Sequence, residues 1–240
     1  MTEAFLWGLL GASSLVLGAV VVRIHSPNRR SLGLIMGFGS GVLLSAVSFE
    51  LIEEALTTSE GAGGVPFGFF GGALVFTAAD ALLQRRATAG RDASKEGGGM
   101  TIALGTVLDG VPESAVLGLT LLTNGTIGVS MLVAVFVSNM PEAIAASTDL
   151  AGSGWSDTRI LRMWGVIALV CAVSSAAGFG LLDGAAPSTV AFTLAFAAGS
   201  VLTMLTTSMI PEAYESAGRA VGLATTLGFA TALGIDWLAA

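Results

Sequence analysis

The sequence of 240 residues carries very little charge. Only 11% of its residues are Asp, Glu, Lys or Arg, whereas 53% are hydrophobic. A soluble globular domain has about 25% charged residues, so this chain has too few to cover a surface that faces water. One cysteine excludes a disulfide framework within the chain. Ten basic residues, all next to apolar segments, argue against nucleic-acid binding. The sequence also lacks a nucleophile–base pair and a glycine-rich phosphate loop, so we do not expect an enzyme.

Long apolar runs dominate what is present. A helix that spans a bilayer needs about 20 mostly apolar residues, and the sequence offers eight such runs. We therefore predict an all-α integral membrane protein with one transmembrane domain over residues 1–240. No basic residue precedes the first run, so we expect it to remain a helix rather than a cleaved signal. The predicted helices cover residues 4–22, 32–56, 66–84, 101–122, 126–149, 160–182, 187–212 and 217–238.

The basic residues predict how the chain lies in the lipid bilayer. Eight fall between predicted helices 1 and 2, 3 and 4, or 5 and 6, and the other two, Arg162 and Arg219, lie in the first turn of predicted helices 6 and 8, at the same side. Cytoplasmic loops carry the excess of Lys and Arg, so we expect a multi-pass protein of the cell membrane with both termini extracytoplasmic. The longest connection, 85–100, contains Gly97, Gly98 and Gly99, and we predict that it is a flexible cytoplasmic loop.

Weak internal repeats are visible in the sequence. Predicted helices 2 and 7 resemble each other but run in opposite directions, which is typical of inverted-topology repeats in transporters. Predicted helices 4 and 5 contain a second repeat. We therefore predict that helices 1–3 and 6–8 are inverted repeats that flank the 4–5 pair. The aligned segments are Gly41–Ser45 with Gly199–Thr203, Ile52–Ala55 with Ile210–Ala213, and Asp109–Ser114 with Ser138–Ala143.

Oxygen-bearing side chains recur at a spacing of four residues inside the apolar helices. That spacing places two side chains on one face of a helix, and an acid at the bilayer centre costs about 2.5–3.5 kcal/mol. Pro112, Pro141 and Pro211 each precede a glutamate, and each proline opens the helix by removing a hydrogen bond. Carboxylates that meet in a low dielectric repel each other, and a divalent cation would relieve that repulsion. The candidate ligands are Glu50, Glu54, Asp109, Glu113, Ser138, Asn139, Glu142, Ser208 and Glu212. For Glu53 and Glu215, a solvated helix end is an equal alternative.

These motifs resemble the ZIP family of divalent-metal transporters. Residues 111–113 and 140–142 match the Pro-Glu motifs of that family's helices 4 and 5, and residues 50–55 and 210–213 match those of helices 2 and 7. The resemblance implies eight helices, outside termini and metal uptake by alternating access, with helices 1, 4, 5 and 6 sliding against 2, 3, 7 and 8. It also implies a binuclear site bridged by Glu113 and Glu142 and completed by Asp109, Ser138 and Asn139.

The chain departs from the family pattern at several positions. Asp109, Ser138 and Glu50 stand where the family has histidines, and Gly110 stands where it has asparagine. The segment around Ser174 lacks a glutamate that is often present in the sixth helix. The remaining donors are oxygen atoms, which favour manganese or ferrous iron, whereas zinc is the family's default substrate.

Three functions are compatible with this pattern. Import of a divalent metal into the cytoplasm is the leading hypothesis. The alternatives are a proton- or sodium-coupled carrier of another solute, suggested by the missing histidines, and a membrane protein that senses metal without transporting it. A homodimer is possible. Glycine spacings such as Gly37 to Gly41 occur at helix–helix contacts, but they arise often in a glycine-rich chain and do not decide the question.

Overall fold

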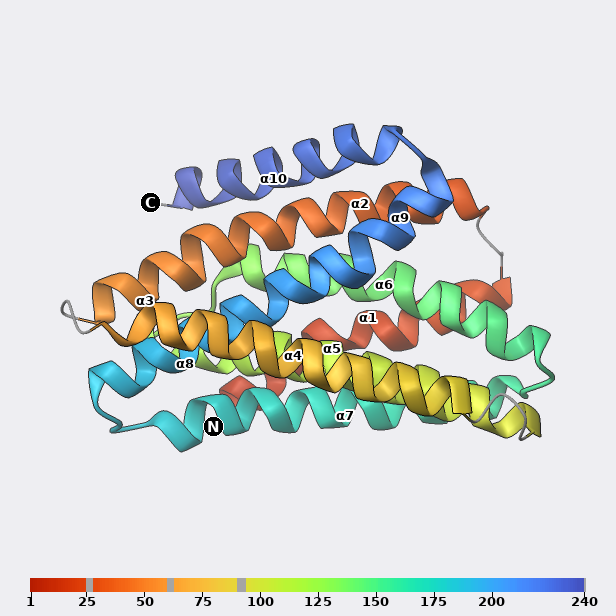
Figure 1. Cartoon of the computed structure of the whole chain (residues 1–240), viewed down its shortest axis with the longest axis horizontal. Helices are drawn as coiled ribbons and strands as arrows, with labels where there is room; N and C mark the ends of the chain where they lie inside the picture. The colour runs from red at the N-terminus through yellow and green to blue at the C-terminus, as the bar shows by residue number, and fades with distance from the viewer. Residues whose placement is uncertain (25–27, 60–62, 90–93, 240) are drawn as a thin grey trace.

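The computed structural model describes residues 1–24, 28–59, 63–89 and 94–239, apart from the side chains of residues 86–89, 94–101, 124, 236 and 239. Over these residues every regular element is helical (Figure 1). The elements form eight consecutive helices, two of which contain a π-helical segment. They are α1 (Thr2–Ile24), α2 (Arg29–Ala46) with η1 (Val47–Ile52) and α3 (Glu53–Thr58), α4 (Gly64–Ala89), α5 (Ser94–Asn124), α6 (Val129–Gly152), α7 (Asp157–Leu182), α8 (Pro187–Met204) with η3 (Leu205–Met209) and α9 (Ile210–Ala217), and α10 (Ala220–Ala239).

The predicted all-helical fold and the number of eight helices are confirmed over the described residues. Seven helices are long and apolar enough to cross a membrane, and the eighth has a shorter apolar stretch, Ala220–Ile235. Successive helices run in alternating directions, and the two chain termini lie toward the same end (Figure 1). Large apolar side chains such as Phe67, Leu74, Val173 and Leu223 face outward, which suits a surface in contact with lipid.

The connection expected over 85–100 is mostly helical in the described residues. α4 continues to Ala89 and α5 begins at Ser94, while residues 90–93 lie outside the description. The residues after Asp80 are mostly alanine, leucine, glutamine and arginine, which favour helix. α4 therefore continues beyond the end of its apolar run. The prediction of a flexible loop was based on the three glycines at 97–99 and not on these helix-forming residues.

Three pairs of helices cross with their backbones in contact: α5 with α7, at Gly118 and Gly178, and the two pairs described next. α2 packs on α10 and α4 packs on α8, and in each pair one glycine from each helix faces a backbone carbonyl of the other helix. A Cβ atom at any of the four glycines would collide with that carbonyl oxygen, so these crossings require glycine. The contacts are Gly41 with Thr225 and Gly228 with Phe38 between α2 and α10, and Gly199 with Phe69 and Gly72 with Phe196 between α4 and α8.

The two π-helical segments occupy matching positions in the chain. When Gly41 is aligned with Gly199, residues 47–52 fall on residues 205–210, so η1 and η3 coincide almost completely. π-Helical turns are rare and frequently lie at functional sites. In this chain each one ends directly before an acidic segment, at Glu53 in the second helix and just before Pro211 and Glu212 in the seventh.

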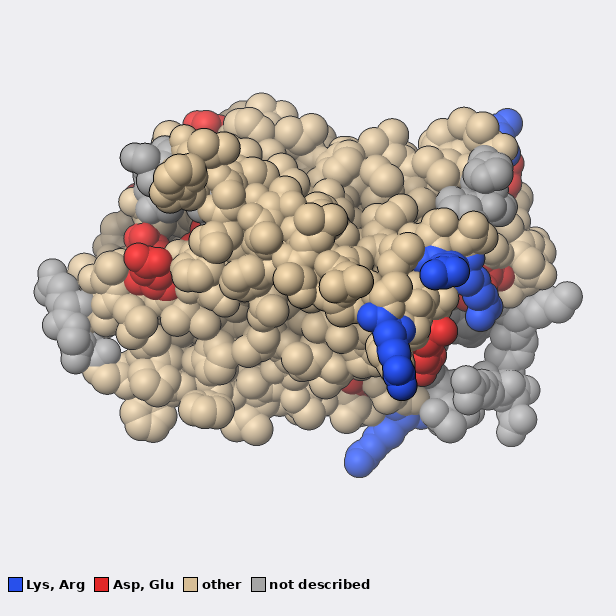
Figure 2. Space-filling view, turned by 90° about the horizontal axis from the view of Figure 1, so that it is seen from above, with Lys and Arg blue, Asp and Glu red and all other residues tan. Residues whose placement is uncertain are grey.

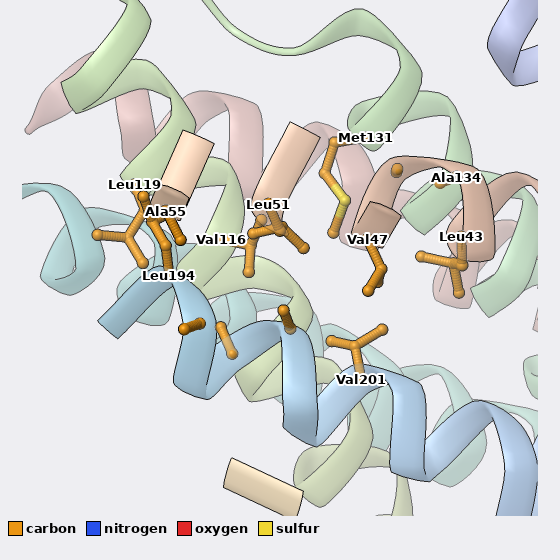
Figure 3. Close-up of a cluster of buried hydrophobic side chains, with 14 of the residues drawn as sticks. Leu43, Val47, Leu51, Ala55, Val116, Leu119, Met131, Ala134, Leu194 and Val201 are labelled. Atoms are coloured by element: carbon orange, nitrogen blue, oxygen red, sulfur yellow. The ribbon is translucent and has the colours of Figure 1, made fainter. Parts of the chain in front are cut away.

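A buried apolar cluster packs η1 against its neighbours. Leu43, Val47, Leu51 and Ala55 lie along one side of the second helix and meet Leu194 and Val201 of α8 (Figure 3). Val116 and Leu119 of α5 and Met131 and Ala134 of α6 complete the labelled part of this cluster. The cluster fixes the second helix between α8 and the α5–α6 pair.

Basic side chains gather at one end of the molecule. On the face drawn in Figure 2, the Lys and Arg side chains are confined to the end where α2 begins and α4 ends, opposite to the chain termini. Arg23 at the end of α1 lies 3.5 Å from Asp157 at the start of α7, measured between Nε and Oδ2. The structure thus brings the described basic residues to one end, as the positions of the predicted helices require.

Candidate metal centre

Two proline-containing helices, α5 and α6, carry the acidic side chains that lie deepest in the protein. Pro112 and Pro141 are inside these helices, and each leaves the carbonyl four residues earlier without its helical donor. α7 supports α5 at this level, because the Ser174 hydroxyl donates a 2.8 Å hydrogen bond to the Val111 carbonyl. This bond ties α7 to α5 at the residue before Pro112.

Three carboxylates on α5 and α6 lie close enough to repel one another. The charges of Glu142 and Asp109 act on Glu113, and the charge of Glu142 acts on Asp109. Glu113 is only 2% exposed. Its Oε2 atom has no hydrogen-bond partner among the described residues. A buried carboxylate oxygen without a donor is costly, so a cation would stabilise this arrangement.

Thr106 is a member of the centre that the sequence analysis missed. Its hydroxyl donates a 2.8 Å hydrogen bond to Oε1 of Glu142, which joins α5 to α6. The side chain is only 3% exposed. Thr106, Asp109 and Glu113 are separated by three and four residues, so they share a helix face. That spacing was the signal that could have identified Thr106.

Ser138 and Asn139 are buried on α6 near the same level. Ser138 is 2% and Asn139 is 3% exposed. The Ser138 hydroxyl donates to the Val135 carbonyl over 3.1 Å, and Gly39 of α2 packs directly against the Ser138 backbone. Nδ2 of Asn139 has no partner among the described residues. Asn139 therefore brings an unsatisfied polar group to the α6 side of the centre.

Ser208 and Glu212 line a cavity that opens toward the basic end of the molecule. This cavity has a volume of about 570 Å³, and Asp149 of α6, Glu215 and Arg29 also line it. The charge of Glu212 interacts with those of Asp109 and Glu142. A carboxylate in the cavity wall, Glu212, is thus near enough for its charge to act on the buried carboxylates.

Glu50 and Glu54 lie apart from the α5–α6 centre. The Glu50 carboxylate packs against the backbone of Gly128, where an added Cβ would collide with Oε2. Gly128 precedes Glu142 by 14 residues, a rise of about 21 Å along a helix. Glu50 also lines a second cavity, of about 820 Å³, with Glu53 and Glu3. Glu54 accepts a 3.2 Å hydrogen bond from the Thr58 hydroxyl.

Eight of the nine candidate ligands fall in three places, and the ninth, Glu54, lies just beyond Glu50 in α3. Asp109, Glu113 and Glu142 converge with Ser138 and Asn139 nearby, Ser208 and Glu212 line one cavity, and Glu50 lies at the other. Over the described part of the chain, no three His, Cys, Asp or Glu side chains are already grouped tightly enough to hold a metal ion. Binding at the centre would require its carboxylates to move closer together.

The fold defines a multi-pass helical membrane protein with acidic side chains buried between its helices. No family model matches the chain. It is 27% identical over 236 residues, 94% of its length, to a protein of Arabidopsis thaliana that carries the name "Putative zinc transporter". The chain spans 37% of the length of that relative. The relative's name is that of a transporter and not of an enzyme, in agreement with the prediction. This distant similarity, which runs along almost the whole chain, supports membership of the ZIP family.

Proposed function

We propose that this protein transports divalent metal cations across the membrane. The observation that carries the proposal is the group of Asp109, Glu113 and Glu142, which repel one another between two opened helices. Residues 96–158 contain no Lys or Arg that could neutralise them from within these helices. Buried acids in membrane helices mark ion routes, and a divalent cation supplies the missing charge.

The cavity at the basic end supports a route from this centre to the cytoplasm. Glu142 lies two turns before Asp149 on the same face of α6. Glu212 lines the cavity together with Asp149, and its charge also acts on Glu142. Because basic residues mark the cytoplasmic side, the cavity is the inner mouth and both termini are extracytoplasmic. The transport direction in this proposal is into the cytoplasm of the cell.

The glycine crossings support the inverted repeat. The α2–α10 pair and the α4–α8 pair share four backbone contacts in matching order, and α2 and α8 run in opposite directions (Figure 1). Together with the matching π segments, this pattern favours a rigid unit of α2, α4, α8 and α10 with two-fold pseudosymmetry. α1, α5, α6 and α7 would move against this unit in alternating access.

Zinc is the first metal to test, because the related plant protein is named for zinc. The oxygen donors of the centre also suit manganese and ferrous iron. We infer that the ion is cargo, bound weakly enough to be released. Uptake of zinc, manganese and iron, each offered at the same concentration, would rank the three.

Uptake by proteoliposomes tests the proposal. The wild-type chain should accumulate at least one of the three metals, and Glu113→Gln with Glu142→Gln should reduce uptake to that of empty liposomes. Asp183→Asn, in the exposed connection between α7 and α8, is a control that should retain uptake. Uptake that survives the double substitution would refute the site. Metal-independent proton or sodium flux with no saturable metal binding would favour a carrier of another solute.

A further inference from the structure

The cavity at the basic end carries acidic side chains on two helices and a basic side chain on a third. The charged residues that line its volume of about 570 Å³ are Asp149 of α6, Glu212 and Glu215 of α9, and Arg29 of α2. The charges of Asp149 and Glu215 act on Glu212. A guanidinium is charged at every physiological pH. Arg29 therefore places a permanent cation beside the path by which a metal cation would leave.

The start of α2 holds the backbone of Arg29 at a fixed place beside α9. Asn28 caps α2, and its side chain accepts a 2.8 Å hydrogen bond from the backbone N–H of Ser31. One turn after Arg29, Gly33 packs so closely on α9 that an added Cβ would lie 2.7 Å from Cβ of Ser216. Ser216 itself lines the cavity. The close contact between α2 and α9 therefore sets the position of Arg29 at the cavity wall.

The side chain of Arg29 is not committed to a partner. It is exposed, and among the residues that the structure describes its guanidinium forms no ion pair with a carboxylate. An arginine side chain has several rotatable bonds, so its guanidinium can turn toward the cavity or away from it. A guanidinium and a divalent metal repel each other, so both cannot neutralise the same carboxylates at once.

We propose that Arg29 is a tethered cation that competes with the transported metal for the carboxylates of this cavity, and so promotes release of the metal into the cytoplasm. This inference rests on the proposed function. Several carboxylates in one cavity would retain a divalent ion, because its departure leaves their charges to repel one another. The guanidinium supplies positive charge as the metal leaves. Arg29 does not ligate the metal, since a guanidinium has no acceptor atom, and it acts through the carboxylates as a positioning residue.

A general effect of surface charge is the competing explanation. Arg30 follows Arg29 in the first turn of α2 and is also exposed, but it does not line the cavity. Basic residues at this end also orient the chain in the membrane. If only the number of positive charges mattered, removal of either arginine would change metal binding equally. Arg30 is therefore the matched control for Arg29.

Calorimetric titration of the full chain in detergent with zinc separates these explanations. Arg29→Gln should tighten zinc binding about fivefold at low salt, which is the size expected for charges that water reaches. Arg29→Lys keeps the charge and should bind zinc as the wild type does, and so should Arg30→Gln. The gain in Arg29→Gln should shrink as sodium chloride is added. Equal tightening in Arg29→Gln and Arg30→Gln, or none in either, would overturn the inference.

A double-mutant cycle tests whether Arg29 acts through the cavity carboxylates. In a background with Glu212→Gln and Glu215→Gln, Arg29→Gln should change zinc affinity much less than in the wild type, because its partners are gone. A change of the same size in both backgrounds would show that Arg29 acts elsewhere, and the inference would be wrong.

Uptake by proteoliposomes tests the role in release. Arg29→Gln should lower the maximal rate of zinc uptake and the half-saturating concentration together, because slower release follows binding. A loss of folded protein would instead lower the maximal rate alone. A maximal rate equal to that of the wild type would overturn the role in release while leaving the proposed function intact. A wild-type chain that neither binds nor accumulates zinc, manganese or iron would overturn both.

Discussion

The second and seventh membrane helices have the same design but different surroundings. Both have a glycine that touches a neighbouring backbone, then a π segment, then acidic residues. At the η1 end, Glu50 packs against Gly128 at the start of α6. At the η3 end, Ser208 and Glu212 instead line a cavity, and the charge of Glu212 acts on Glu142 of the carboxylate centre.

Glu50 is thus engaged with the start of α6, whereas Glu212 lines the cavity at the basic end. In an alternating-access carrier, two matched halves take different conformations at any moment. Cavities lie at both ends of the molecule, of about 570 Å³ beside Glu212 and about 820 Å³ beside Glu50, and the Glu50–Gly128 contact lies at the larger one. Four experiments test this comparison, and they are arranged from the largest expected effect to the smallest.

The first experiment tests whether the two glycine crossings are equivalent. Gly41→Ala and Gly199→Ala should each lower stability by about 1–3 kcal/mol or more, because the new methyl group overlaps a carbonyl oxygen. Thermal unfolding in detergent would measure both. Gly222→Ala on α10 is the control, since nothing lies within 4 Å of its added Cβ. A large loss for one variant and none for the other would break the equivalence of the two pairs.

The second experiment tests the carboxylate centre between α5 and α6. Thr106→Val should weaken metal binding about tenfold, because a partner that orients a ligand contributes that much. Thr106→Ser keeps the hydroxyl and should restore affinity. Thr120→Val is the matched control, since Thr120 is also buried on α5 but donates to the Leu117 carbonyl. If calorimetry gives the same affinity for Thr106→Val as for the wild type, Thr106 does not position Glu142.

The third experiment weakens the contact between Glu50 and Gly128. Glu50→Gln should weaken this contact, and a loss of about 1 kcal/mol shifts the population of molecules in which it is broken about fivefold. The reporter is Ala134→Cys in a Cys171→Ala background, with the rate of modification by a membrane-impermeant thiol reagent as the measurement. Glu53→Gln, exposed in the same cavity, should leave the rate unchanged. Equal rates in all three proteins would contradict a closing role for Glu50.

The fourth experiment sets a lower limit. Asp157→Asn removes the partner of Arg23, but both side chains are more than half exposed. Exposed ion pairs contribute about 0–1 kcal/mol, so the melting temperature should hardly change. A large drop would show that the α1–α7 contact depends on this surface pair, and stability comparisons between the halves would then need correction for it.

Much of the fold was predictable because membrane helices are long apolar runs with charges between them. The basic residues fixed the alternation of direction, and the Pro-Glu steps pointed to Glu113 and Glu142. The prediction failed where helix formers continued beyond the apolar run, as they do in α4 after Asp80. The glycine crossings had a trace in sequence, because Gly41 and Gly199 begin the aligned segments.

The division of the candidate ligands was not predictable from spacing alone. Pairs such as Glu50 and Glu54 were placed on one face under regular α-helical geometry, and the sequence gives no compositional sign that η1 departs from it. Thr106 was accessible through its spacing from Asp109.

The π segments have a consequence for how such a protein can change by single-residue insertion or deletion. A π turn holds roughly one residue more than an α turn, and each residue of an α-helix advances the chain by about 100°. Deleting one residue between 47 and 52 would restore an α-helix and rotate the upstream residues relative to Glu53 and Glu54 by that angle. Gly41 would then leave α10 while the acidic segment stayed in place. The extra residue of the π turn therefore sets the angle between two faces of one continuous helix. One face packs against α10, and the other carries the acidic residues.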